Sequence, residues 1–201
     1  MNLVLTAICG YLIGSLSLAI IISRKVYGSD IRSKGSGNTG ATNMARVFGL
    51  KAGVATLVFD VAKASAAMLL GKVLAGSVGL SIGGVAAVLG HCFPVFHSFK
   101  GGKAVAVGLA VIFAASLKAG LIAVAAFALM FFLSRKVSLS SVTAALFAAA
   151  AVFVFKCPPE YIAMTVFTAA AVIIRHRANI VRLIHGEEPD FSLPSGKKNP
   201  S

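Results

Sequence analysis

The sequence is poor in charge and in the residues that usually build metal or redox centres. Only 12% of the 201 residues are charged, tryptophan is absent, and the three cysteines and four histidines are widely spaced. A soluble domain carries about 25% charged residues, so the composition excludes an ordinary soluble fold. Cys9, Cys92 and Cys157 have neither metal-ligand nor redox spacing, and the dispersed histidines suggest no metal centre. We therefore expect no disulfide, no metal ion and no cofactor.

Long uncharged apolar stretches dominate the chain instead. Hydrophobic residues make up 58% of it, and the mean hydropathy is +0.91. Stretches of this kind are typical of bilayer-spanning helices. The sequence predicts a single all-α integral membrane domain over residues 1–201 with about seven transmembrane helices. The spans are expected at residues 3–23, 52–72, 77–93, 104–117, 119–134, 138–155 and 160–176, with Lys118 in a tight hairpin at the surface because a lysine in mid-membrane is costly.

Lysine and arginine are distributed unequally between the two sides of such a bundle. With seven spans, the loops 24–51, 94–103 and 134–137 and the tail from Arg175 share one side and hold 15 of these residues, whereas the other side holds 3. Basic loops mark the cytoplasmic side, so we expect the N-terminus outside and the C-terminus in the cytoplasm. This asymmetry also accounts for the net charge of +13. Nucleic-acid binding is not expected, because no aromatic residues are interleaved with the basic clusters.

The first basic loop contains closely spaced glycines. Gly35, Gly37 and Gly40 formally satisfy G-x-G-x-x-G, but the dinucleotide-binding interpretation requires a βαβ unit that a helical membrane chain lacks. Closely spaced glycines can expose backbone N–H groups to an anion, and a helix beginning near Thr42 would add positive potential. We favour an anion site over a flexible linker. The candidate binding residues in this loop are Ser36, Gly37, Asn38, Asn43 and Arg46.

The second basic loop ends in Lys100-Gly101-Gly102-Lys103 at the start of a span. A nucleotide-binding P-loop is rejected, because glycine is missing five places before Gly102 and Ser or Thr is missing after Lys103. Two glycines flanked by two lysines at a helix start predict a second anion site. His91 ends the preceding span, where it either supports this site or only ties the loop by a hydrogen bond.

The third cluster covers residues 175–183. His176 and Asn179 are three residues apart and would share one helix face, beside Arg175 as a supporting cation. Such a pair suits a hydroxyl substrate that carries phosphate, although snorkelling arginines and an incidental histidine are the alternative. No Ser–His–Asp or Cys–His arrangement is evident. We therefore expect a substrate that is already activated, with the protein supplying position and positive charge.

Two further features have competing interpretations. Asp60 and Lys63 lie within one span, where they form either an ion pair that fixes helix packing or part of a proton path. A proton path would suit a transporter or channel for a small phosphate-bearing anion, which is the main alternative function; a non-catalytic protein that binds anionic lipid is a third. His185 and Asp190 match the H-x-x-x-x-D spacing of soluble acyltransferases, but Pro189 breaks the helix there, so the match is taken as accidental.

Three motifs together resemble a known family. GSGNTGATNMAR, GHCFPVFHSFKGGKAVAV and RHRANIVRLIHGEE, in this order, resemble the acyl-phosphate:glycerol-3-phosphate acyltransferases of bacterial membranes. The resemblance implies transfer of a fatty acyl group from acyl phosphate to glycerol 3-phosphate, which gives lysophosphatidic acid and phosphate in the first step of phospholipid synthesis. It also implies a multi-pass protein of the bacterial cell (inner) membrane whose active site faces the cytoplasm, with membrane lipid as a further partner.

The resemblance also implies residue roles. Ser36, Asn38, Arg46 and Lys103 match phosphate-holding positions, His176 and Asn179 match the pair that orients the attacking hydroxyl, and Ser141 matches a further polar position. The general base is left open between His176 and a substrate phosphate, and the oligomeric state between monomer and dimer. This sequence departs from the family pattern at Ser17, where proline is usual, at Ala104 and Val107, where Gly and Thr are usual, and at His185, where Asn is more frequent.

Overall fold

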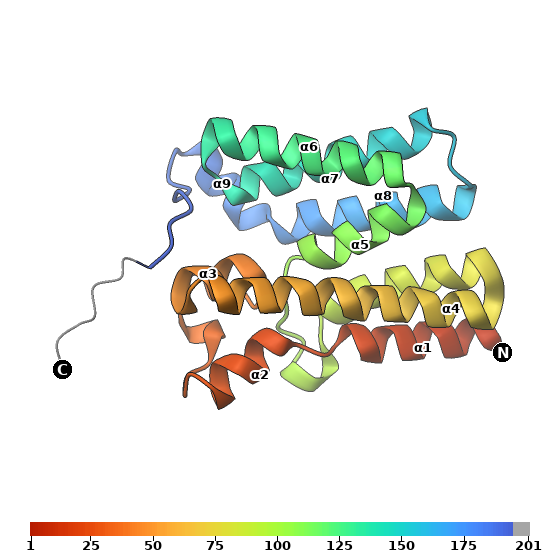
Figure 1. The fold of residues 1–201 in the computed structure, drawn as a ribbon, viewed down its shortest axis with the longest axis horizontal. Helices are drawn as coiled ribbons and strands as arrows, with labels where there is room; N and C mark the ends of the chain where they lie inside the picture. The colour runs from red at the N-terminus through yellow and green to blue at the C-terminus, as the bar shows by residue number, and fades with distance from the viewer. Residues whose placement is uncertain (195–201) are drawn as a thin grey trace.

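The computed structural model describes residues 1–194 and is all-helical over that range, as predicted (Figure 1). Lys197 and Lys198, which contributed to the predicted basic tail, lie outside the described residues. The α-helices are α1 (Asn2–Gly14), α2 (Leu18–Lys25), α3 (Ala41–Phe48), α4 (Leu50–Cys92), α5 (Val105–Ala115), α6 (Leu117–Ser134), α7 (Val137–Val154), α8 (Pro159–Arg175) and α9 (Arg177–Ile184), with short 3-10 helices at Ile31–Ser33 and Val95–His97.

The helices form two layers (Figure 1). One layer contains α1 and α4, the other contains α6, α7 and α8, and α5 lies between them. Within residues 1–194, four helical segments are long and apolar enough to cross a membrane: Asn2–Lys25, Leu50–His97, Leu117–Ser134 and Val137–Val154. The short helices α3 and α9 lie together at the end of the molecule opposite to the N-terminus (Figure 1).

The 43-residue helix α4 is two helices that double back on each other. Its backbone leaves the helical region at Ala75 and at Gly76, which has φ +63° and therefore favours glycine. Beyond the turn the two halves touch through backbone. A Cβ atom on Gly79 would overlap the carbonyl of Gly71, and one on Gly83 would overlap the carbonyl of Ala67. Small residues thus let the two helix backbones approach each other closely.

The first predicted span is broken, which the sequence analysis did not anticipate. Helix α1 ends at Gly14, and Ser17 is extended before α2 begins. The Ser15 hydroxyl donates to the Tyr11 carbonyl and accepts from the amide of Val95, at 2.8 and 3.4 Å. Side-chain hydroxyls that bond to backbone in this way compete with helical hydrogen bonding. The break leaves the carbonyl of Leu16 available to a side chain of α4.

The predicted hairpin near Lys118 is confirmed. Helix α5 ends at Ala115, Ser116 is extended, and its hydroxyl caps α6 by accepting from the amide of Ala119 at 3.3 Å. Lys118 is exposed at the start of α6, with its ammonium 5.6 Å from the ring centre of Phe155. The cost of a lysine inside the apolar layer is thereby avoided.

Candidate active site

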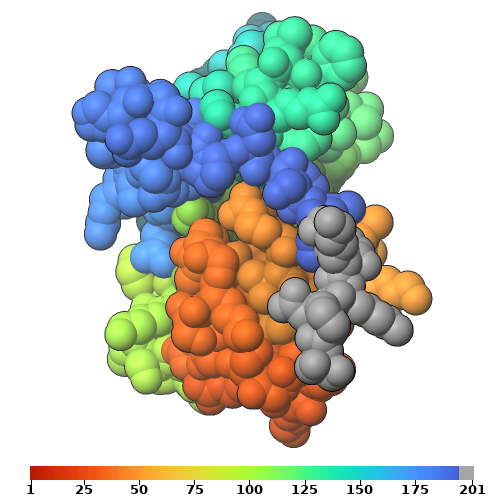
Figure 2. Space-filling view, turned by 90° about the vertical axis from the view of Figure 1, so that its left-hand side faces the viewer, coloured from red at the N-terminus to blue at the C-terminus, as the bar shows by residue number. Residues whose placement is uncertain are grey.

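The three basic segments meet at one cleft of about 720 Å³. It opens among α3, the first half of α4, the start of α5, α7 and α9, at the end of the molecule that Figure 2 faces. The side chains of most of the predicted site residues line it. They are Ser36, Asn38, Asn43, Arg46, His91, Lys103, Ser141, His176 and Asn179.

Asn43 lies in this cleft, but its amide holds the first loop together. The side chain is 1% exposed, and both of its N–H groups are used, donating to the carbonyls of Lys34 and Asn38 at 3.0 and 2.9 Å. Its Oδ1 accepts from the amide of Ser36 at 2.9 Å. An amide group has two donors, so none remains for a ligand. The expected role of Asn43 in binding phosphate is therefore corrected to one in shaping the loop.

Three backbone amides of the first loop are not free to bind an anion. The amides of Ser36, Gly37 and Gly40 are already bonded within the loop, that of Gly37 to the Lys34 carbonyl and that of Gly40 to the Asn38 side chain. Gly37 itself does not line the cleft. The glycines serve close packing and positive φ instead: Gly35 and Gly37 have φ of +57° and +70°, and a Cβ at 35 would overlap Asn43. These three amides are not available to an anion, whereas α3 begins at Ala41, close to the predicted helix start at Thr42, and anion binding at this loop stays a prediction.

The second loop uses its glycines in the same way. A Cβ on Gly101 would overlap the His91 carbonyl, one on Gly102 would overlap the His91 ring, and the Gly102 amide donates to that carbonyl at 3.0 Å. Arg175 holds the loop from the other side. It donates to the carbonyls of both glycines, each at 3.1 Å, and stacks on Phe93. Neither glycine lines the cleft, and Lys100, predicted to bind phosphate, is exposed outside it.

Lys103 anchors a chain of polar contacts across the cleft. Its Nζ donates to Oδ1 of Asn179 at 2.6 Å, and Nδ2 of Asn179 donates to Glu188 at 2.6 Å. The other carboxylate oxygen of Glu188 pairs with Arg182 at 2.8 Å. Arg182 and Glu188 are cleft residues that the sequence analysis did not select. Arg182 could have been found from its spacing, since it lies three residues after Asn179 on the same helix.

Some of the cations that line the cleft are in ion pairs with carboxylates, and others are not. Arg182 pairs with Glu188, and Asp190 pairs with Lys136 at 2.9 Å. Asp60, the remaining acidic residue in the lining, pairs with Lys63. Within residues 1–194 no ion pair involves Arg46 or Lys103, which both line the cleft. These two cations are the ones left for an anionic ligand.

The cleft alters the protonation of two of its residues. Burial lowers the pKa of Lys103 to about 8, a shift that the neighbouring Glu188 carboxylate partly opposes. Burial also lowers the pKa of His176 to about 4, so its imidazole is neutral at physiological pH. His176 Nδ1 lies 2.8 Å from the carbonyl of Val172, which can only accept, so Nδ1 carries the proton. The Nε2 atom is left as a hydrogen-bond acceptor.

His176 and Asn179 face the same cleft, although they do not lie within one helix. His176 is the junction residue between α8 and α9, and Asn179 lies in the first turn of α9. Ser141 also lines the cleft, with its hydroxyl donating to the Val137 carbonyl at 2.8 Å. The H-x-x-x-x-D spacing is accidental, as expected: His185 is exposed, and Asp190 is bonded to Lys136.

The C-terminal segment crosses the mouth of the cleft. Lys136 Nζ donates to the carbonyl of Glu188 at 2.6 Å, and the amide of Phe191 donates to the carbonyl of Arg135 at 3.0 Å. The Phe191 ring packs edge-on against Phe131. Figure 2 shows this blue segment lying between the orange α3 region and the green helices. The segment therefore ties the α6–α7 connection to the residues that hold Asn179.

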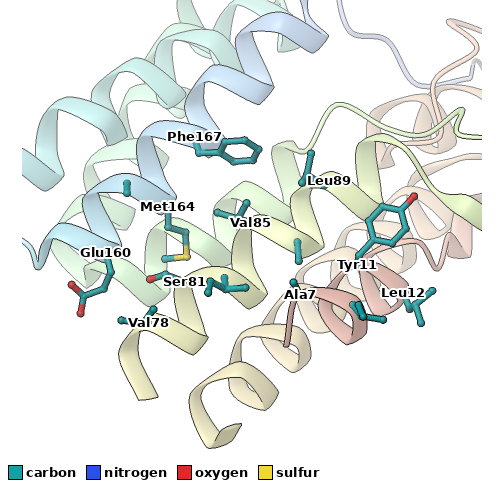
Figure 3. Close-up of a pocket in the computed structure, with 14 residues that line it drawn as sticks. Ala7, Tyr11, Leu12, Val78, Ser81, Val85, Leu89, Glu160, Met164 and Phe167 are labelled. Atoms are coloured by element: carbon teal, nitrogen blue, oxygen red, sulfur yellow. The ribbon is translucent and has the colours of Figure 1, made fainter. Parts of the chain in front are cut away.

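A second cavity, of about 790 Å³, lies elsewhere and is apolar (Figure 3). It is a groove between α1, the second half of α4 and α8, lined by side chains such as Tyr11, Val85, Leu89 and Phe167. It shares no lining residue with the cleft. Its lining residues include Glu160 but no lysine or arginine.

Comparison with known proteins agrees with this geometry. The family model described as glycerol-3-phosphate acyltransferase matches residues 4–186. The chain belongs to the glycerol-3-phosphate acyltransferase family. A relative in Bacillus anthracis, glycerol-3-phosphate acyltransferase 2, is 43% identical over 92% of this chain and 97% of its own length. A glycerol-3-phosphate acyltransferase of Neisseria meningitidis serogroup C is 44% identical over 89% of this chain and 92% of its own.

Two solved structures have the same fold. Both are crystal structures of PlsY, an integral membrane glycerol 3-phosphate acyltransferase, one in a glycerol 3-phosphate form and one in a lysophosphatidic acid form. Each is 39% identical to this chain and covers 96% of both chains, with TM-scores of 0.90 and 0.88. Membership of this family of acyltransferases replaces the transporter and lipid-binding alternatives.

Proposed function

We propose that this chain transfers a fatty acyl group from acyl phosphate to a hydroxyl of glycerol 3-phosphate and releases lysophosphatidic acid and inorganic phosphate. The hydroxyl oxygen attacks the acyl carbonyl carbon, a C–O ester bond forms, and the bond from that carbon to the phosphate oxygen breaks. Acyl phosphate is a mixed anhydride with a good leaving group, so no protein nucleophile is required. The observation that carries the proposal is the cleft that combines two unpaired cations with a neutral histidine.

Two phosphates in one cleft require two sources of positive charge. Within residues 1–194, Arg46 and Lys103 are the lining cations outside any ion pair, and they come from α3 and from the loop just before α5. Charge-assisted hydrogen bonds to phosphate are stronger than neutral ones. Lys103 would also stabilise the charge that develops on the leaving phosphate, which is the main electrostatic task in this reaction. Ser36 and Asn38 add neutral groups beside Arg46.

His176 is suited to orienting the acceptor hydroxyl. Its Nε2 atom accepts a hydrogen bond, because Nδ1–H is bonded to the Val172 carbonyl. An imidazole whose pKa is about 4 holds a proton weakly, whereas the phosphate that leaves the anhydride gains a negative charge on its departing oxygen and is the stronger base. The hydroxyl proton would therefore finish on the departing phosphate. Asn179, bonded to both Lys103 and Glu188, holds the Lys103 ammonium in place.

The same cleft also offers a place for the acyl chain. Leu57 of α4, Val105 of α5 and Phe127 of α6 contribute apolar side chains to its lining. A chain lying there would enter from the bilayer between helices. The donor would then present its phosphate to the cations and its carbonyl carbon to the acceptor hydroxyl.

We also propose a topology for this single membrane-embedded catalytic unit of residues 1–201. The segment of α1 and α2, the two halves of α4, and α5 to α8 would make seven crossings, with the N-terminus outside. The positive-inside rule supports this orientation, since the basic loops then face the cytoplasm. The active site would open at the cytoplasmic face of the bacterial cell membrane, where water-soluble glycerol 3-phosphate is available.

A donor comparison with purified protein tests the reaction. Palmitoyl phosphate with glycerol 3-phosphate should give equimolar lysophosphatidate and inorganic phosphate, measured by mass spectrometry and a phosphate assay. Omission of glycerol 3-phosphate should abolish phosphate release and serves as the control for simple hydrolysis. Product formed from palmitoyl-CoA or an acyl carrier protein thioester, with none from palmitoyl phosphate, would refute the donor assignment.

The pH dependence of kcat/KM should show a limb assigned to Lys103. The ammonium must be protonated to bind phosphate, so activity falls as the pH rises above about 8. His176 must be unprotonated, so an acid limb from this residue appears only as the pH falls to about 4. Titration of the substrate phosphates near about pH 6 is superimposed on both. Lys103→Arg should remove the alkaline limb, because a guanidinium does not titrate there; an unchanged limb in that variant would contradict the assignment.

A further inference from the structure

Three ionisable residues lie buried beside the cleft, and the reaction described above does not use them. Asp60, Lys63 and His91 are 3%, 5% and 7% exposed. Asp60 and Lys63 lie in the first half of α4, and His91 lies at the end of its second half. Asp60 and His91 also line the cleft. Buried ionisable groups are costly in a membrane protein, so we expect these three to have a specific role.

Lys63 has a partner for each of its three N–H groups. Its Nζ lies 2.8 Å from Asp60 Oδ1, 2.6 Å from the carbonyl of Leu16 and 3.1 Å from His91 Nδ1. An ammonium group has three donors and no acceptor. The Leu16 carbonyl is available because the first span is broken at residues 15–17. The ammonium therefore joins the α1–α2 break to both halves of α4.

These contacts determine the tautomer of His91. Because the ammonium only donates, Nδ1 of His91 must accept, and the ring proton lies on Nε2. The Asp60 carboxylate is farther from Nδ1, at 3.5 Å. A protonated His91 that donated to Asp60 would bring two cations within 3.1 Å of each other around one carboxylate. The neutral tautomer avoids that repulsion.

The Nε2 edge of His91 lies against the second loop. A Cβ atom on Gly102 would overlap Nε2, so the ring edge touches the backbone one residue before Lys103. The Gly102 amide bonds to the His91 carbonyl. With Nδ1 bonded to Lys63, Nε2–H is the only donor left to the ring, and His91 lines the same cleft as Lys103.

We propose that Asp60 and Lys63 are positioning residues that hold His91 as its neutral Nε2–H tautomer, so that His91 donates a hydrogen bond to a substrate phosphate oxygen next to Lys103. Asp60 keeps Lys63 charged, and Lys63 fixes the ring. Packing alone does not account for the trio, since a buried ion pair is often replaceable by apolar residues of similar volume at no cost in stability. The proposal rests on the acyl transfer to glycerol 3-phosphate, whichever acyl donor is used.

Two double variants of equal charge distinguish a role of Asp60 and Lys63 in positioning His91 from a role in helix packing alone. In Asp60→Asn/Lys63→Gln the amide of Gln can still donate to His91 Nδ1, whereas in Asp60→Asn/Lys63→Met no donor remains. Both remove the ion pair. We expect equal melting temperatures in detergent, but kcat/KM about tenfold to a hundredfold lower in the Met variant than in the Gln variant. A raised KM for one substrate would identify the phosphate that His91 contacts. Equal kcat/KM in the two folded variants would overturn the proposal.

The comparison uses whichever donor the wild-type protein accepts, so failure of the acyl-phosphate assignment stays distinguishable from failure of this proposal. A second measurement needs neither activity nor folded double variants. Nitrogen-15 NMR of histidine-labelled wild-type protein at neutral pH should show His91 with hydrogen on Nε2 and an acceptor Nδ1, the signal being assigned by its loss in His91→Gln. The Nδ1–H tautomer or an imidazolium would also overturn the proposal.

Discussion

Lys103→Met is expected to lower kcat/KM by about 10²–10³-fold, the effect of removing one preorganised donor from a site where negative charge develops. Methionine keeps much of the apolar stem but removes the ammonium. The substitution also leaves the Oδ1 atom of Asn179 without its donor and removes a cation from the neighbourhood of Glu188. Both phosphates would then depend on Arg46. Initial rates over a matrix of donor and acceptor concentrations would give kcat and both KM values.

Lys51→Met is the matched control for Lys103→Met. Lys51 is exposed in the first turn of α4 and does not line the cleft, so loss of its charge should change the rate less than twofold. Melting temperatures in detergent would show that both variants are folded. A Lys103→Met enzyme with near wild-type rates would mean that the leaving phosphate is stabilised by another group.

Substitutions at His176 are expected to have the second largest effect and to distinguish two roles. His176→Ala removes the acceptor for the attacking hydroxyl and should lower kcat by about 10²–10⁴-fold, the usual range for a residue that handles the transferred proton or its hydrogen bond. If His176 orients the hydroxyl without keeping its proton, His176→Gln should retain a clearly higher rate than the alanine variant, because the Gln carbonyl can still accept.

Equal losses in the alanine and glutamine variants of His176 would argue that the imidazole takes the proton. His185→Ala is the control, since His185 is exposed at the end of α9 and outside the cleft. Its kcat should stay at the wild-type value. The comparison is made at neutral pH, far above the lowered pKa of His176, so the protonation state of the imidazole does not confuse the result.

The sequence predicted the helices well because apolar length and the cost of buried charge act locally. The hairpin at Lys118 and the turn between residues 72 and 77 follow from the length of the apolar stretches and from the cost of burying a charge. The break at residues 15–17 does not, because it depends on Ser15 bonding to Val95, which is 80 positions away. A stretch of apolar residues in sequence gives no sign of such a contact.

The sequence predicted which residues line the cleft better than it predicted their hydrogen bonds. The three basic segments do meet, yet glycine spacing alone could not show that the loop amides bond to Asn43, Lys34 and Asn38. Whether an N–H is free is a property of the folded loop. Glu188 was passed over because its neighbours suggested only an accidental motif, and its burial against Asn179 becomes visible only when the tail folds back.

The path of the C-terminal segment has a practical consequence for anyone who prepares this protein. Glu188, Pro189, Asp190 and Ser192 line the cleft, and the Glu188 carbonyl accepts a hydrogen bond from Lys136. A purification tag joined downstream of Ser192 would be covalently continuous with a segment that lines the cleft. The N-terminus lies at the opposite end of the molecule (Figure 1). An affinity tag at Met1 is the better choice for kinetic work, and C-terminally tagged preparations call for tag removal before rates are compared.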